Sequence, residues 1–133
     1  MAEIRDIADA QSHRELCRTL LEILSGWGLT AEEQRRLLGL PPMSAREWRK
    51  LAAGHASLPD DPDTLLRIHH LLSIYRALRS LFPHSSQSAD LYVTTPLPAL
   101  GGRSPLDIML DDDERGMKNL LQHLEGRSPL DFD

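Results

Sequence analysis

The side chains best suited to chemistry in this chain are the cations of the segment SAREWRK, residues 44–50. Arginine and lysine on the outer face of a short helix bind phosphate groups, and a serine at the helix start donates to the same oxygens. The preceding segment, AEEQRRLL, adds more polar groups of this kind. The predicted nucleic-acid contacts are Gln34, Arg35, Arg36, Ser44, Arg46, Arg49 and Lys50. A merely solvated helix face gives the same pattern, because arginine and lysine are mostly exposed in any protein.

A second unusual feature is the hexapeptide GRSPLD, which occurs once from Gly102 and again from Gly126. Serine followed by proline and an acid is a helix-start signal. The first copy precedes a long helical pattern, whereas the second is followed only by Phe132 and Asp133, too few residues for a stable turn. The tail 127–133 is therefore expected to fray, to dock on its own fold or a sister subunit, or to insert into a partner.

No grouping of residues indicates catalysis. His69 and His70 are adjacent, so on a helix they point about 100° apart and do not share a metal easily. The single cysteine, Cys17, supplies no thiolate pair, and it lies near an apolar helix face, where packing is the expected role. The acidic run DDDE at 111–114 has no base or nucleophile beside it. We therefore expect a binding protein rather than an enzyme, with no metal and no cofactor.

Composition and charge limit the remaining classes. The net charge is −5, made up of −1 over residues 1–60 and −4 over residues 61–133. A near-neutral front half still binds phosphate if its cations share one face. One cysteine excludes an internal disulfide. The N-terminus lacks the apolar run of a signal peptide, and we expect a cytoplasmic protein.

The segments that carry the predicted nucleic-acid contacts are expected to be helices. Apolar residues from Leu16 to Trp27 line one helix face, and Ser12 with Glu15 predicts a capping box at its start. Thr30 with Glu33 predicts a second start, ended by Gly39. After the turn at Pro41-Pro42, Ser44 and Glu47 predict a third start, with Trp48, Leu51 and Ala52 pointing inward. This order is the outline of a helix-turn-helix over residues 1–60.

The rear half, residues 61–126, is expected to begin with a spine helix over about 62–82, which carries apolar residues on two faces. Residues 84–100 stay open, since LYVTT fits a short strand or an irregular docking segment. Ser104 starts a short helix, and DDDE starts the last one. Met117, Leu120, Leu121 and Leu124 form its buried stripe before Gly126. The prediction is an all-α protein whose two helical domains are joined by a long shared helix, followed by the tail.

Several of these segments together resemble a known family. RIHHLLSIYRALRSLFP, a spacer, LGGRSPLDIML and a final amphipathic helix resemble the toxin-binding domain of the Xre/MbcA/ParS antitoxins over residues 67–126. LTAEEQRRLLGL and SAREWRKLAAG resemble the Xre-type helix-turn-helix found upstream in the same proteins. The spacer DLYVTTPLPAL lacks the Trp and Asn-Pro elements of many relatives. The terminal GRSPLDFD is no part of the family pattern.

The resemblance implies a partner and a role. Such antitoxins block the active-site cleft of a RES-type toxin, an enzyme that consumes NAD, and they repress their own operon by binding operator DNA, typically as a dimer. A cleft that holds a pyrophosphate should be electropositive, so the acidic tail is a hypothetical anion mimic. The toxin contacts implied are Gly101, Gly102, Arg103, Ser104, Asp107, Arg127, Ser128, Asp131, Phe132 and Asp133. The alternatives are a stand-alone regulator whose rear half only dimerises, and a helical adaptor without DNA binding.

Overall fold

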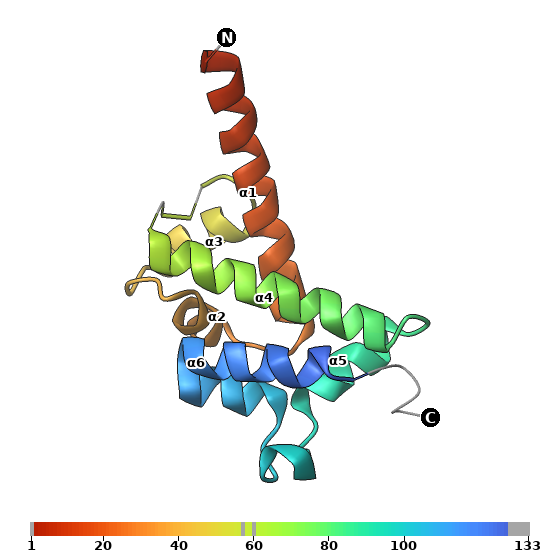
Figure 1. Ribbon diagram of the computed structural model, residues 1–133. Coiled ribbons are helices and arrows are strands. Elements are labelled where there is room, and N and C mark those ends of the chain that lie inside the picture. The colour runs from red at the N-terminus through yellow and green to blue at the C-terminus, as the bar shows by residue number, and fades with distance from the viewer. Residues whose placement is uncertain (1, 57, 60, 128–133) are drawn as a thin grey trace.

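The chain is all-helical in the computed structural model, which describes the backbone of residues 2–56, 58–59 and 61–127 and the side chains from Arg14 onward. Within these ranges there are six α-helices and one 3-10 turn, and the β-structure is a single bridge between Leu97 and Arg103 (Figure 1). The elements are α1 Ala2–Gly26, α2 Ala31–Leu38, α3 Ala45–Ala52, α4 Pro62–Leu81, α5 Ser86–Thr94, η1 Pro98–Leu100 and α6 Pro105–Glu125. None of the helices in the described part of the chain is long and apolar enough to cross a bilayer.

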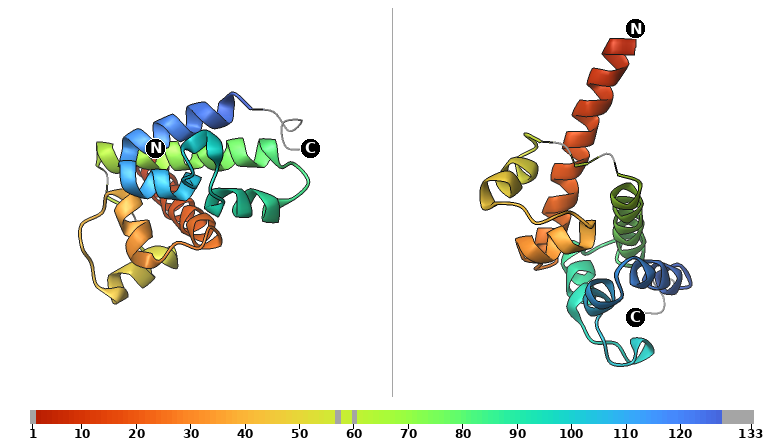
Figure 2. Two further views of the ribbon diagram at one scale, coloured as in Figure 1. Left: turned by 90° about the horizontal axis from the view of Figure 1, so that it is seen from below. Right: turned by 90° about the vertical axis from the view of Figure 1, so that its left-hand side faces the viewer.

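Helix α1 is longer than the sequence pattern predicts. It begins at Ala2, so Ser12 lies within the helix and the predicted capping box of Ser12 with Glu15 is wrong. Neither proline nor glycine interrupts residues 2–25, and a serine inside a helix costs too little to stop it. The first turns of α1 project beyond the rest of the molecule (Figures 1 and 2).

The starts of α2 and α3 follow their capping signals. The Thr30 hydroxyl accepts from the Glu33 amide at 3.1 Å, the Glu33 carboxylate accepts from the Thr30 amide at 2.9 Å, and Gly39 ends α2 with a φ of 68°. At α3 the Ser44 hydroxyl accepts from the Glu47 amide at 3.1 Å, which is one half of the predicted box. Leu51 is buried and Trp48 half-buried, but Ala52 is exposed, so its inward assignment is wrong.

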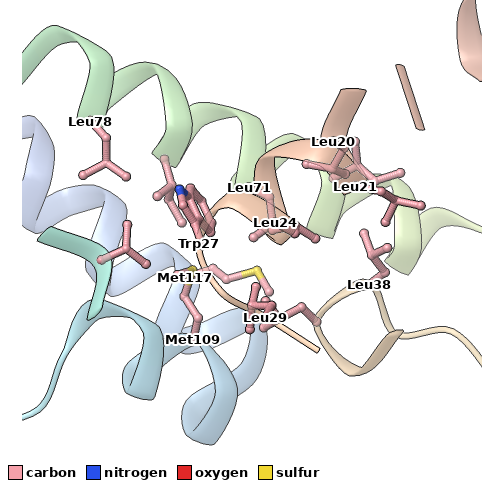
Figure 3. Close-up of a cluster of buried hydrophobic side chains, with 14 of the residues drawn as sticks. Leu20, Leu21, Leu24, Trp27, Leu29, Leu38, Leu71, Leu78, Met109 and Met117 are labelled. Atoms are coloured by element: carbon pink, nitrogen blue, oxygen red, sulfur yellow. The ribbon is translucent and has the colours of Figure 1, made fainter. Parts of the chain in front are cut away.

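One hydrophobic core connects the front and rear helices. Helix α4 lies along α6 and also contacts α1, α2 and α5, as its two apolar faces indicate (Figure 1). Trp27 at the end of α1 packs among Leu24, Leu71, Met109 and Met117 (Figure 3). These side chains come from both halves of the chain, so the predicted front and rear units are built around shared apolar contacts.

Residues 86–94 form a helix rather than the strand or irregular segment that their sequence suggested. The Ser85 hydroxyl caps α5 by accepting from the Ser88 amide at 3.0 Å. Ala89, Tyr92 and Val93 are buried, and α5 packs on α4 and α6. Serine and threonine give this segment a loop-like composition, but the buried face supplies the packing that stabilises the helix.

Helix α6 consists of two helical segments that meet at a kink. Asp113 at the kink has a φ of 60° and a ψ of −137°, a backbone conformation that non-glycine residues rarely adopt. Gly116 is required on the far side, because a Cβ there would lie 2.3 Å from the Ile108 carbonyl oxygen. The predicted separate starts at Ser104 and at DDDE correspond to these two segments. Met117, Leu120 and Leu124 are buried, and Leu121 is half-buried.

Candidate functional site

The cations of α3 form an exposed surface, which we call the α3 cation surface: Ser44, Arg46, Arg49 and Lys50. The three charged side chains form no ion pair with any residue in the described part of the chain. Ser44 uses one hydroxyl lone pair as the helix cap, which leaves its hydrogen for a second partner. Charge that is not neutralised inside the protein remains for an external anion.

The candidates on α2 do not share this surface. Gln34 is 4% exposed, and its amide donates to the Leu29 carbonyl at 3.0 Å and to the Ser25 hydroxyl at 3.2 Å. The prediction that Gln34 contacts DNA is therefore wrong, because this buried side chain anchors α2 to the end of α1. The amphipathic pattern of the sequence placed Gln34 on a polar face of α2. A glutamine that is buried and hydrogen-bonded inside the protein gives the same sequence pattern.

The two arginines of α2 are held by the protein as well. Arg35 pairs with Glu32 and donates to the Leu40 carbonyl at 2.6 Å, which orders the connection toward α3. Arg36 is exposed but points to the rear half, where it donates to the Leu110 carbonyl of α6 at 3.5 Å. Arg35 and Arg36 thus stabilise the fold around α2 rather than extend the α3 cation surface.

The connection between α2 and α3 departs from the common helix-turn-helix. It runs from Gly39 to Ser44 and includes Pro41-Pro42, whereas the usual turn has about 3–4 residues. Both helices pack on α1. The first turn of α2 carries Glu32 and Glu33, which disfavour phosphate at that end. The surface of α3 is therefore the part of the α2–α3 pair with the charge to bind an external anion.

The rear loop, Gly101–Asp107, is a rigid turn that starts α6. Gly101 and Gly102 both have left-handed φ values, 70° and 82°, and the Gly102 amide donates to the Leu97 carbonyl at 2.9 Å. Ser104 is buried and is the predicted start of the helix, and it forms a capping box with Asp107: each side chain accepts from the other's amide at 3.1 Å. Gly101, Gly102 and Asp107 are exposed, so the loop presents mainly backbone to a partner.

Arg103 in this loop is bound to acids of the kink. Its guanidinium lies 3.3 Å from Asp111 and 3.1 Å from Asp112, and it also donates to the Asp107 carbonyl. These contacts raise the pKa of Arg103, with the hydrogen bond to Asp112 as the largest cause. The arginine thereby fixes the loop against the first segment of α6, on a surface where Asp111 and Asp112 remain exposed.

Arg67 holds the kink itself, and we refer to its contacts as the Arg67 clasp. From α4 it bonds both carboxylate oxygens of Asp113, donates to Asp63 at 3.0 Å and donates to the Leu37 carbonyl of α2 at 3.2 Å. The hydrogen bond from Arg67 holds the pKa of Asp113 below its usual range. A Cβ at Gly39 would lie 2.8 Å from Arg67 Nε, so glycine is needed there for space as well as for its positive φ.

The clasp borders a cavity of about 460 Å³ between α2 and α6, lined by Arg35, Arg36, Arg67, Asp111 and Asp113 together with apolar neighbours. Reasoning from the sequence missed Arg67. The available signal was one arginine within the apolar run LLRIHHLL, since a charge on a doubly buried helix needs an internal partner. Which carboxylate it would meet depended on the fold.

Two other titratable residues singled out in the sequence, Cys17 and His70, are buried. Cys17 is buried, which raises its thiol pKa to about 11, so it stays protonated near neutral pH. Burial likewise lowers the pKa of His70, against the opposing effect of Glu114 at 3.9 Å. Across the described residues, no group of three or more His, Cys, Asp or Glu side chains is placed to hold a metal ion.

Of the toxin contacts predicted in the tail, Arg127 lies within the described residues and the others lie beyond them. Arg127 is exposed, and its amide donates to the Leu124 carbonyl at 3.1 Å just after α6 ends. The candidates Ser128, Asp131, Phe132 and Asp133 lie outside the described residues. Arg127 follows the opposite end of α6 from Gly101–Asp107, so Arg127 itself does not lie at the start of that helix.

This arrangement defines a small helical binding protein with a cationic front helix and an acidic, kinked rear helix. Residues 77–124, from the end of α4 through α6, match the family described as the antitoxin Xre/MbcA/ParS C-terminal toxin-binding domain. The chain is also 37% identical over 106 residues to the uncharacterized protein y4oB of Sinorhizobium fredii, covering 79% of this chain and 78% of that protein.

The chain belongs to the Xre/MbcA/ParS-type antitoxins, and its role is that of the antitoxin in a toxin–antitoxin pair. The matched segment contains α5, the rear loop and the kinked α6. The likeness to y4oB is more than twice as long as this segment, so it also includes residues outside the toxin-binding domain.

Proposed function

We propose that this antitoxin inhibits an NAD-consuming RES-type toxin with its rear half, residues 61–126 and the tail, and represses its own operon by binding operator DNA with α3 in the front half, residues 1–60. The observation that carries the toxin-binding role is the family match over residues 77–124. The RES type of the toxin rests on the resemblance of the sequence to antitoxins of that pairing. No catalytic function is assigned to this chain.

Electrostatics supports the toxin side of the proposal. An enzyme that consumes NAD must hold a pyrophosphate, which requires a cleft rich in positive potential. The rear half has a net charge of −4, and Asp111 and Asp112 are exposed beside the rear loop. Asp131 and Asp133 add negative charge to the tail. We infer that this acidic side faces the toxin and that the tail occupies its anion-binding cleft.

The α3 cation surface supports the DNA side. An α-helix fits the major groove, where arginine reads guanine and lysine or arginine neutralises phosphates. We assign Ser44 and Arg46, at the start of α3, to the base edges and nearest phosphates, and Arg49 and Lys50 to phosphates at its end. The operator would be bound by a homodimer, with one α3 for each half-site.

The toxin test uses the product of the neighbouring gene. Its NAD consumption is measured in the presence of wild-type antitoxin, of a variant that lacks residues 127–133, or of a variant with Asp111→Asn and Asp112→Asn. We expect stoichiometric inhibition by wild type and at least about tenfold weaker inhibition without the tail, which corresponds to about 1.4 kcal/mol. Inhibition that is unchanged by the deletion contradicts the anion-mimic role, and no inhibition by wild type contradicts the toxin partner.

The DNA test measures binding to the promoter of the chain's own operon at several salt concentrations. The variant Arg46→Gln with Arg49→Gln should bind more weakly and lose about one unit of salt slope for each phosphate contact removed. Arg76→Gln with Arg115→Gln is the matched control, because both arginines are exposed on the rear half and the charge change is equal. Equal loss in both variants would show that only total charge matters.

A further inference from the structure

A pocket of about 270 Å³ lies where α1 meets the end of α3. It is lined by Arg14, Glu15, Arg18, Ala53, Gly54 and His55. Arg14 and Arg18 are four residues apart on α1 and therefore project from the same side of that helix. Neither residue was a predicted contact, and the pocket lies outside the α3 cation surface.

Arginines outnumber acids in the lining of this pocket. Arg14 and Arg18 form no ion pair or side-chain hydrogen bond with any described residue. Glu15 is the one carboxylate of the lining, so two guanidinium groups and an imidazole face a single acid. The planar guanidinium group of arginine can donate two parallel hydrogen bonds to two oxygens of a phosphate.

Gly54, just after α3, lies close to both arginines of α1. Gly54 has a φ of 79°, and a Cβ there would lie 3.6 Å from Arg18 Cδ and 3.9 Å from the Arg14 carbonyl oxygen. The His55 amide donates to the Lys50 carbonyl at 2.9 Å, and the Ala53 amide donates to the Arg49 carbonyl at 3.0 Å. The lining residues Ala53, Gly54 and His55 therefore come directly after Arg49 and Lys50, at the end of α3.

The length of α3 relates this pocket to a DNA strand. Its eight residues span about 12 Å, which is close to the about 12 Å width of the major groove. We infer that α3 places its first turn at the base edges and its last turn near a phosphate strand. The groups just beyond that last turn then face the backbone rather than the bases.

We propose that Arg14 and Arg18 form a phosphate-binding site for the DNA backbone, with His55 as a third donor. The proposal rests on the DNA-binding role given to α3 and extends the interface to α1. The site is independent of sequence, so it strengthens binding to any duplex and fixes the angle at which α3 enters the groove.

A purely structural role for the same arginines makes different predictions. Cations near the C-terminal end of α3 would interact favourably with its helix dipole and so stabilise the fold. In that case the substitutions lower the thermal stability and leave the salt dependence of DNA binding unchanged. A carboxylate-rich protein partner at this pocket would likewise leave the DNA salt slope unchanged.

The test is the salt dependence of DNA binding for the full chain with Arg14→Gln and Arg18→Gln. We expect the slope of log affinity against log salt to become less negative by about one to two units on both the promoter and an unrelated duplex, with the melting temperature unchanged. The variant with Arg14→Lys and Arg18→Lys should keep most of the slope, because it keeps both charges.

The outcomes separate this inference from the function on which it rests. If Arg46→Gln with Arg49→Gln weakens binding but the Arg14 and Arg18 variant keeps the wild-type slope, the phosphate site is refuted and α3 binding stands. If wild type binds neither duplex, both proposals fail. A fall in melting temperature with an unchanged slope assigns the arginines to helix stabilisation and also refutes the site.

Discussion

Two groups of arginines in this antitoxin are used in opposite ways, one on α1 and α3 and the other around the kinked start of α6. Arg14, Arg18, Arg46 and Arg49 around α1 and α3 have no acidic partner among the described residues, whereas Arg67 and Arg103 each bind two carboxylates around α6. A paired arginine fixes local geometry, while an unpaired one keeps its charge for another molecule. The comparison teaches that the arginines of α1 and α3 remain available to bind anions, whereas Arg67 and Arg103 hold the kinked start of α6 in one shape.

The largest expected effect comes from a substitution in the core, and it tests whether the front and rear halves unfold together. Trp27→Ala removes a fully buried side chain that contacts both halves, so it should destabilise the protein by about 3–5 kcal/mol. Because the core is continuous, urea unfolding should shift as one cooperative transition. Two transitions, with only the front half shifted, would contradict a shared core and make the comparison one between independent domains.

The next effect concerns the kink. In Gly116→Ala the new Cβ meets the Ile108 carbonyl oxygen and the Asp112 side chain, so the two segments of α6 must separate at a cost of about 1–3 kcal/mol. Gly126→Ala is the matched control, since the nearest atom to its Cβ is 3.7 Å away. Thermal unfolding of both variants measures the difference. Equal melting temperatures would mean that the close contact at the kink does not matter.

The Arg67 clasp gives a smaller effect of the same kind. Arg67→Lys keeps the charge but cannot bridge Asp63, Asp113 and the Leu37 carbonyl together, so we expect a loss of about 1–2 kcal/mol. Arg76→Lys, on the exposed side of α4, is the control. Denaturant unfolding measures both. If the two variants are equally stable, the clasp contributes charge alone and the contrast between paired and unpaired arginines weakens.

The smallest effect is a pH dependence from His70. Burial lowers its pKa in the folded state below the ordinary value of 6.5, despite the attraction of Glu114, while His69 and Lys118 oppose protonation. The unfolded chain therefore takes up a proton first, so stability falls as the pH drops below about 6.5, by at most about 1.4 kcal/mol per pH unit. His70→Leu should flatten this fall between pH 7 and 5, whereas exposed His84→Leu should not. If stability falls with decreasing pH equally steeply in His70→Leu and His84→Leu, the burial of His70 does not cause the pH dependence.

Local signals predicted much of the fold, since a capping residue or a glycine stop acts on its own neighbours. Thr30, Gly39, Ser44 and Ser104 all have the roles that their sequence context indicates. Ser12 failed because an N-cap residue type carries no information once the preceding residues are also helical. The helix at 86–94 depends on a buried face, which composition does not reveal.

The candidate site was predicted less completely, for a physical reason. The exposed cations of α3 follow from helix periodicity, but whether a polar residue faces solvent or another helix depends on packing. Gln34 and Arg35 are held inside the fold, and Arg67 meets Asp113 across 46 positions of sequence. The pocket at Arg14 and Arg18 likewise exists only because α3 packs on α1.

The most direct test of the account is to measure toxin affinity and operator affinity on one preparation of the Arg46→Gln and Arg49→Gln variant. If the toxin and the operator bind to separate surfaces of one folded core, operator affinity should fall at least about tenfold while toxin affinity stays within about twofold of wild type. A parallel fall in both affinities, or unchanged binding to the operator, would contradict the division of labour between α3 and the rear half.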